Sequence, residues 1–277
     1  MYTETALRRG VRRRLMAWYA RNGRDLPWRR TRDPYAILVS EVMLQQTQVA
    51  RALPAYRRFL GRFPTLRALA RTSLGDVLRE WQGLGYNRRA RDLHRIARAN
   101  PTALPSAVDA LDALPGVGAY TAGAVACFSR GERVAFADTN VRRVLGRVVL
   151  GRVATEREAV AIDGELMPRD AASWHHALMD LGATLCRARE PLCPTCPLAV
   201  TCRGRGTATV AQRRRGTAFA TSTRRLRGIA LRELAKGDMP RTRLVRLLAD
   251  RRAAQVIAGL AKEGLIERAA VRVRLPN

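Results

Sequence analysis

Lysine is almost absent from the sequence: Lys236 and Lys262 are the only two, and none occurs in the first 235 residues. Any mechanism in that segment that needs a lysine amine, such as a Schiff base with a sugar aldehyde or a Walker-type phosphate clamp, is therefore excluded. Long hydrophobic runs are also missing, because no apolar stretch approaches the roughly 18 residues of a membrane span, and the N-terminal region lacks the apolar core of a signal peptide. We expect a cytoplasmic protein with no membrane partner.

Acidic residues are scarce as well, with 23 Asp and Glu against 51 Lys and Arg, which gives a formal net charge of +28. A field of that size attracts phosphate backbones through counterion release, so nucleic acid is the leading partner. The alternative is a basic enzyme whose arginine excess reflects the coding bias of a GC-rich genome. The length of 277 residues suggests about two domains.

Cysteine is limited to five residues, four of which lie close together as Cys186-x6-Cys193-x2-Cys196-x5-Cys202. An intracellular chain seldom uses disulfides, so these thiols are predicted to be ligands. Their spacing favours a [4Fe-4S] cluster, and a structural zinc site is the alternative, because four-cysteine sites are common for zinc. Cys127 lies in an apolar stretch and is predicted to be a buried, inert thiol.

Apolar residues recur at helical spacing through most of the chain before residue 204, which predicts a mainly α body. The clearest stripes cover residues 7–18, 37–49, 107–114, 119–128, 141–149 and 177–185. Within the second stripe, Glu41, Gln45 and Gln48 recur at helical spacing, either as a functional polar face or as a plain solvated one.

The C-terminal region has a different pattern. Residues 207–223, which include three consecutive arginines at 213–215, lose the periodicity and are predicted to be a linker. Residues 224–277 contain short helical patterns at 226–235, 242–249 and 253–261 and an alternating strand pattern at 271–275. This order predicts a small winged-helix-like module, which serves either as an additional DNA or protein contact or as packing for the rest of the chain.

Two glycines punctuate the segment Leu114-Pro115-Gly116-Val117-Gly118, between two helical stripes. A tight hairpin there would point backbone N–H groups outward at a helix N-terminus and could hold a DNA phosphate; the alternative is an ordinary helix turn. About twenty residues later, Asp138 precedes another helical stripe. From the sequence alone an N-cap is the favoured interpretation of this aspartate.

The order of the hairpin, Asp138 and the four-cysteine loop resembles the helix-hairpin-helix superfamily of DNA glycosylases. The segment Ser40-Glu-Val-Met-Leu-Gln-Gln-Thr-Gln-Val49 resembles its adenine DNA glycosylase branch. The resemblance covers roughly residues 5 to 204. It implies a bilobal catalytic domain at 1–206, with a six-helix barrel at about 23–134 and an iron–sulfur cluster lobe at 1–22 plus 135–206, followed by the linker and the module at 224–277.

The resemblance also implies catalytic roles. Glu41 matches the general acid that protonates adenine, which is a poor leaving group until its N7 carries a proton. Asp138 matches the carboxylate that stabilises the cationic sugar as the glycosidic bond breaks. Tyr120 stands where lyase-active relatives carry a lysine, so we expect base release without efficient cleavage of the strand at the abasic site.

Further residues are implied to contact DNA. Gln46 and Tyr86 match positions that wedge into the duplex beside the base opposite the adenine. The hairpin residues that match the phosphate cradle are Leu114, Gly116, Val117 and Gly118. Residues implied to lie near the base pocket are Trp28, Arg29 and His176, the last of which replaces the usual Gln or Glu.

The function that the resemblance implies is a monofunctional glycosylase of base excision repair that removes adenine mispaired with guanine or 8-oxoguanine. We expect it to act as a monomer on double-stranded DNA in the nucleoid. The alternatives are a thymine or uracil mismatch glycosylase of the same fold and a non-catalytic DNA-binding scaffold. Longer relatives carry a second domain that inspects 8-oxoguanine, for which the residues after the linker are too few, so the opposite-base preference stays open.

Overall fold

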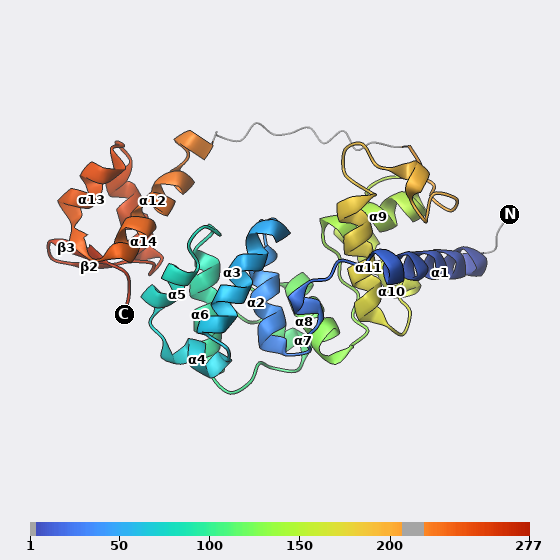
Figure 1. Cartoon of the computed structure of the whole chain (residues 1–277), viewed down its shortest axis with the longest axis horizontal. Helices are drawn as coiled ribbons and strands as arrows, with labels where there is room; N and C mark the ends of the chain where they lie inside the picture. The colour runs from blue at the N-terminus through green and yellow to red at the C-terminus, as the bar shows by residue number, and fades with distance from the viewer. Residues whose placement is uncertain (1–3, 207–218) are drawn as a thin grey trace. The chain divides into compact units, whose positions relative to one another are not determined.

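The computed structural model describes residues 4–206 and 219–277 (Figure 1). Most of the predicted linker, with the arginines at 213–215, lies outside the described residues. The described chain is mainly helical and has a small sheet near its C-terminus, which confirms the predicted fold class. Of the helices in these two ranges, none is long and apolar enough to cross a membrane.

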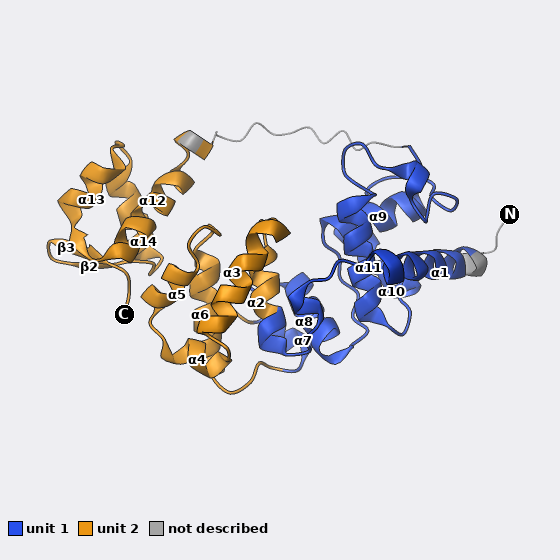
Figure 2. Ribbon diagram, in the orientation of Figure 1, with its two compact units in different colours: residues 1–37, 106–113, 117–213 blue, residues 38–105, 114–116, 214–277 orange. Residues whose placement is uncertain are grey.

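Two compact units divide the chain and are coloured separately in Figure 2. Unit 1 consists of residues 1–37, 106–113 and 117–213, and unit 2 consists of residues 38–105, 114–116 and 214–277. Each unit is therefore assembled from segments that are distant in the sequence. Helix α2 (Pro34–Leu44) begins in unit 1 and ends in unit 2.

Unit 1 is built around helix α11, which packs against α9 and α1. Its helices are α1 (Glu4–Asn22), α7 (Val108–Asp112), α8 (Ala119–Arg130), α9 (Thr139–Leu150), α10 (Glu156–Leu166) and α11 (Ala171–Thr184), with 3₁₀ turns η1 (Pro27–Arg29) and η2 (Cys193–Thr195). Trp174 of α11 is fully buried and donates its indole N–H to Asp163 at 2.7 Å. The same carboxylate lies 2.8 Å from His175 Nε2, so this buried acid is satisfied inside the core.

Unit 2 combines an N-terminal group of helices with the C-terminal module. Its helices are α3 (Val49–Arg62), α4 (Leu66–Arg71), α5 (Leu74–Glu80), α6 (Arg88–Ala99), α12 (Thr223–Lys236), α13 (Arg241–Leu248) and α14 (Ala253–Lys262), with a 3₁₀ turn η3 (Phe219–Thr221). Strands β1 (Met239–Pro240), β2 (Glu267–Ala269) and β3 (Arg272–Arg274) form an antiparallel sheet in the order β1-β3-β2. The three predicted helices and the strand at the end of the module are present, but β1 between α12 and α13, and β2 before β3, were not predicted.

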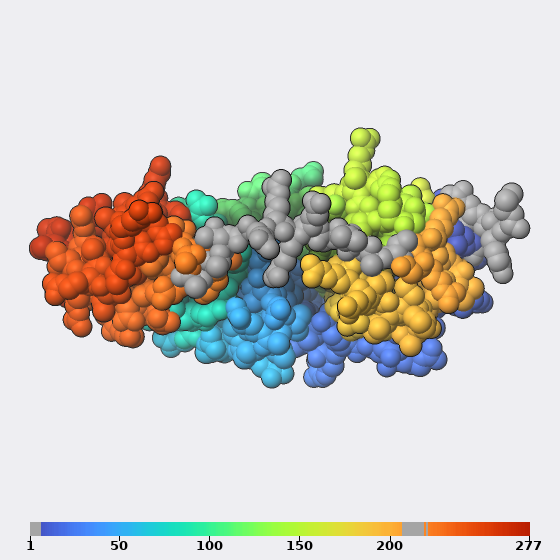
Figure 3. Space-filling view, turned by 90° about the horizontal axis from the view of Figure 1, so that it is seen from above, coloured from blue at the N-terminus to red at the C-terminus, as the bar shows by residue number. Residues whose placement is uncertain are grey.

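The C-terminal module packs directly on α5 and α6. The N–H of Gly75 donates to the carbonyl of Pro276 at 2.7 Å, and a Cβ at Gly75 would meet that oxygen at 2.7 Å, so only glycine allows this approach. Arg91 donates to the carbonyl of Glu263 at 2.6 Å, and the Glu263 carboxylate pairs with Arg88 at 3.2 Å. Figure 3 shows the module, in orange and red, lying against the turquoise part of the chain that contains α5 and α6.

Candidate active site and cluster loop

Helix α2, with the sequence PYAILVSEVML, carries the candidate general acid among mostly apolar residues of the same helix. Its residues from Tyr35 to Met43 are buried, Ser40 at 1% and Glu41 at 7% exposure. A helix that is apolar on all sides lies in a core, and burying a carboxylate there costs free energy. The solvated-face interpretation is therefore wrong for Glu41, because its side chain is buried.

The predicted helix over 37–49 is wrong at its end, because α2 stops at Leu44. Gln46 adopts a φ of 58°, in the left-handed region that ends a helix, and Gln48 is already the N-cap of α3. The freed carbonyl groups of Val42 and Gln45 accept hydrogen bonds from Nη1 of Arg89, at 2.6 and 2.5 Å. Arg89 therefore caps the helix that carries Glu41.

The two predicted wedge residues share an unusual backbone conformation. Tyr86 has a φ of 47°, which is strained for a bulky side chain as it is for Gln46. Arg89 also donates to the carbonyl of Gly85 at 3.2 Å, and its guanidinium lies 5.4 Å from the centre of the Tyr86 ring. Burial lowers the pKa of Arg89 to about 10. The half-buried guanidinium of Arg89 thus supports the backbone next to Gln46 and the backbone next to Tyr86.

The glycine hairpin lies between α7 and α8. Gly116 has a φ of 74°, and a Cβ there would approach the Cβ of Asp92 to 3.3 Å, so the turn requires glycine for two reasons. Gly118 is the N-cap of α8 and is exposed. Leu114 and Val117 are half-buried. The geometry leaves the predicted phosphate cradle accessible.

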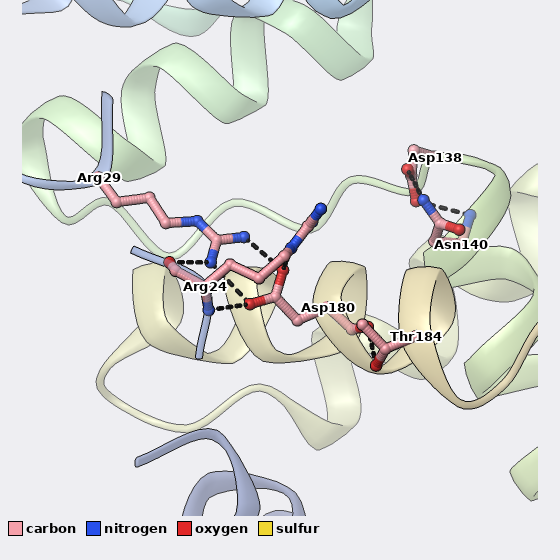
Figure 4. A network of polar contacts seen from close by, with 6 residues as sticks. All are labelled: Arg24, Arg29, Asp138, Asn140, Asp180 and Thr184. Atoms are coloured by element: carbon pink, nitrogen blue, oxygen red, sulfur yellow. Dashed lines mark hydrogen bonds and ion pairs between the residues drawn. The ribbon is translucent and has the colours of Figure 1, made fainter. Parts of the chain in front are cut away.

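Asp138 is the N-cap of α9, as the residue pattern alone favoured. Its Oδ1 accepts from the backbone N–H groups of Asn140 and Val141 at 2.8 and 2.7 Å, and its Oδ2 accepts from Nδ2 of Asn140 at 2.9 Å (Figure 4). Capping fixes the orientation of the carboxylate and does not exclude a catalytic role. On α8, Tyr120 packs edge-on against Phe136, which lies two residues before Asp138 in the sequence, with ring centres 5.5 Å apart.

Helix α9 joins Asp138 to the cysteine loop through two buried arginines. Arg143 donates to Oδ1 of Asn140 at 2.7 Å and to the carbonyl of Cys186 at 2.6 Å. Arg147 donates to Sγ of Cys186 at 3.4 Å. Burial lowers the pKa of Arg143, and the negative charge that the Cys186 thiol carries when ionised opposes this shift. An unbroken chain of polar contacts therefore runs from Asp138 to the first cysteine of the loop.

The four loop cysteines line one small cavity with apolar walls. Its sulfur-bearing residues are Cys186, Cys193, Cys196 and Cys202, and its walls include Val144, Leu181 and Leu198. Within 4–206 and 219–277 no group of three or more His, Cys, Asp or Glu side chains is arranged to hold a metal ion. Cys127 stands apart from this cavity and is fully buried, as predicted, and burial raises its pKa to about 12.

The predicted pocket residues Arg29 and His176 lie near a buried acid that the sequence analysis missed. Asp180 of α11 has no exposed surface and pairs with Arg29 at 2.7 Å and with Arg24 at 2.6 Å (Figure 4). His176 stacks on Phe128 with ring centres 4.2 Å apart. Burial, followed by the charge of Arg29, lowers the pKa of His176 to about 3, so its imidazole is neutral at physiological pH.

Trp28 is also buried, at 6% exposure.

The sequence contained one signal for Asp180: it is the only acid inside the apolar stripe 177–185, and aspartate is seldom fully buried without a partner. For Arg89, Asn140, Arg143 and Arg147 the sequence offered no comparable signal, since each is one arginine or amide among many.

The candidate residues divide between the two units. Unit 2 holds Glu41, Gln46, Tyr86, Leu114 and Gly116. Unit 1 holds Trp28, Arg29, Val117, Gly118, Tyr120, Asp138, His176 and the four loop cysteines. Unit 2 therefore carries the buried acid and the two predicted wedge residues, and unit 1 carries the capped aspartate and the cysteine loop.

Comparison with known proteins connects these features. Residues 39–167 match the family model described as HhH-GPD superfamily base excision DNA repair protein. A solved structure of a thermostable thymine-DNA glycosylase is similar in fold, with a TM-score of 0.68 and 27% identity over 73% of this chain and 97% of that one.

Relatives of similar length have a more specific description. The adenine DNA glycosylase of Mycobacterium tuberculosis (strain CDC 1551 / Oshkosh) is 45% identical over 243 residues, which cover 83% of this chain and 80% of the relative. That of Mycolicibacterium smegmatis is 42% identical over 273 residues, which cover 92% of each. The buried glutamate of the Ser40–Val49 motif, the glycine hairpin, the capped aspartate and the cysteine loop thus lie in a chain that belongs to the adenine DNA glycosylase family.

Proposed function

We propose that this protein is a DNA glycosylase of base excision repair that hydrolyses the N-glycosidic bond of adenine mispaired with guanine or 8-oxoguanine. The observation that carries the proposal is the burial of Glu41 on an apolar helix, within a motif typical of the family to which the chain belongs. The fold alone does not choose the base, because a thymine-DNA glycosylase shares it.

The proposed chemistry divides between two carboxyl groups. Glu41, as the carboxylic acid, donates its proton to N7 of adenine, and the electron pair of the glycosidic bond leaves with the base. The carboxylate of Asp138 stabilises the positive charge that develops on the sugar. Water then adds to the anomeric carbon and loses a proton, which leaves an abasic site. The three hydrogen bonds to Asp138 support this role, because they fix the direction in which its negative charge acts.

The substrate test uses four duplexes that differ in one base pair: A:G, A:8-oxoG, T:G and U:G. Each is incubated with the protein and then treated with alkali, which cleaves the strand at an abasic site. We expect cleavage at the adenine strand of the first two. Release of thymine or uracil without release of adenine would contradict the proposal and support a thymine or uracil mismatch glycosylase. No release from any duplex would support a non-catalytic DNA-binding scaffold.

We propose that the enzyme is monofunctional. A lyase step needs an amine that attacks the sugar, and the residue at the corresponding position is Tyr120, whose phenol cannot form a Schiff base. Borohydride should therefore trap no covalent adduct with DNA that contains an abasic site. The variant Tyr120→Lys supplies the amine and should give a trapped band if position 120 lies at the sugar; a trapped band from the unaltered protein would contradict the proposal.

The proposed cofactor is a [4Fe-4S] cluster held by Cys186, Cys193, Cys196 and Cys202. Its support is the convergence of four thiols on one apolar cavity, because a cubane takes one thiolate at each iron and spreads its ligands more widely than a single ion does. When bound, the cluster would supply a cross-link for the loop. Protein purified without oxygen should contain about four irons per chain, whereas one zinc and no iron would refute the assignment.

Several finer expectations belong to the same proposal. The catalytic domain extends over 1–206, the linker over 207–223 and the winged-helix-like module over 224–277. The enzyme acts as a monomer on chromosomal DNA in the nucleoid. The preference for 8-oxoguanine over guanine is expected to be modest, and single-turnover rates on the A:G and A:8-oxoG duplexes will measure it.

A further inference from the structure

The C-terminal module contributes arginines to the surface that carries both predicted wedge residues. A hollow of about 870 Å³ is lined on one side by Gln46, Arg51 and the loop from Gln82 to Asn87, and on the other by Phe219 and helix α12. All of these residues belong to unit 2. Four arginines and no acidic residue line the hollow, so its chemistry suits a polyanion of nucleotide size.

Helix α12 is divided into two faces. Leu226, Ala230, Leu231 and Leu234 are buried in the module. The opposite face lines the hollow with Arg224, Arg225, Gly228, Ile229 and Arg232. The three arginines are exposed, and Gly228 between them leaves open space where a side chain would stand. A backbone could therefore approach α12 closely along this face.

Arg224 makes direct contact with the wedge. Its guanidinium lies 4.9 Å from the centre of the Tyr86 ring, whose other guanidinium neighbour is Arg89. Tyr86 is 41% exposed, and the attraction of its ring to the two neighbouring guanidinium groups favours one ring orientation. The strained backbone of Tyr86 also indicates a functional constraint at this position.

We propose that Arg224, Arg225 and Arg232 bind backbone phosphates of the DNA strand that carries the base opposite the excised adenine, and that Arg224 positions Tyr86 against that strand. The inference rests on the proposed function, because the wedge assignment identifies the strand. It gives the C-terminal module a recognition role in addition to the packing role that its contacts with α5 and α6 establish.

The test measures binding without turnover. The duplex carries 2′-fluoro-2′-deoxyadenosine opposite guanine, because the fluorine resists formation of the sugar cation. Arg224→Ala/Arg225→Ala/Arg232→Ala is compared with Arg241→Ala/Arg243→Ala/Arg246→Ala, which removes the same charge from α13, outside the hollow. The α12 variant should make the slope of log affinity against log salt less steep by about two to three, while the α13 variant keeps the slope.

Strand assignment comes from phosphate ethylation interference. The α12 variant should lose interference on the strand opposite the adenine and keep it on the adenine strand. A 2-aminopurine beside the opposite base should brighten when Tyr86 enters the duplex, and Arg224→Ala should reduce that signal at saturating protein, whereas Arg224→Lys should restore the phosphate contact but not the full signal. The melting temperature of each variant is measured first, and only variants that melt at the wild-type temperature are compared in the binding experiments.

Equal losses in the α12 and α13 variants, or loss of interference on the adenine strand instead, would overturn the inference. Failure of the proposed function would look different, since the protein would release no adenine from an ordinary A:G duplex. The binding experiment does not depend on that release.

Discussion

Arg29 binds Asp180 in a bidentate manner, with Nη1 2.7 Å from Oδ2 and Nη2 2.7 Å from Oδ1. Asp180 has no exposed surface, and Arg24 satisfies the same carboxylate through its side chain and its backbone N–H. The pair joins the segment before α2 to α11 within unit 1. Burial by itself would raise the pKa of Asp180, but the hydrogen bonds and charge of Arg29 hold that pKa below its usual value.

Asp180→Asn should destabilise the protein strongly, because Arg29 would remain buried without its anion. Breaking a buried pair from one side costs about 3 to 5 kcal/mol, which thermal melting will detect. Since the folded pKa of Asp180 is lowered, its contribution is present above the unfolded pKa of about 4 and is lost as the pH falls through the folded value. Wild type should therefore lose stability below about pH 4 more steeply than the variant; parallel pH profiles would contradict this assignment.

Glu41→Gln should strongly slow adenine release and leave duplex binding nearly unchanged, because the amide keeps the shape of the side chain but delivers no proton. General acid catalysis typically contributes about 100- to 10,000-fold, which sets the expected fall in single-turnover rate. Glu156→Gln, at an exposed position on α10, is the matched control. A Glu41 variant within tenfold of wild type would remove Glu41 from the mechanism.

Two substitutions at Asp138 separate capping from catalysis. Serine caps a helix about as well as aspartate, whereas alanine does not, and loss of a cap costs about 1 kcal/mol. Both Asp138→Ser and Asp138→Ala should be inactive, because both remove the negative charge that faces the sugar cation, but Asp138→Ala, which also loses the cap, should melt earlier than Asp138→Ser. An active serine variant would reduce Asp138 to a structural residue.

Cys196→Ser should lower the iron content of the purified protein and destabilise the loop at 186–202. Cys127 offers an internal control, since it is buried away from the cavity and its thiol does not ionise readily. Cys127→Ala should retain the full iron content. Equal iron in all three proteins, measured together with visible absorption, would contradict the cysteine assignment.

The helical pattern and the family motifs predicted the fold class and the individual positions of the acid, the capped aspartate and the cysteine loop. They failed where a long-range contact decides the local structure. The stripe over 37–49 looked continuous, yet the carbonyl groups at its end bond Arg89, which lies more than forty residues later. Asp180 and its two arginine partners are about 150 residues apart, so no local window contains both members of either pair.

The bonds of Arg89 have a consequence for genetics. The same guanidinium caps α2 through Val42 and Gln45, and holds Gly85 next to Tyr86. The free-energy effects of substitutions at Gln46 and Tyr86 should therefore not be additive, because residues that share a partner are energetically coupled. A natural variant at either position has to be judged in the background of the other, and compensating pairs should be found between these two short loops.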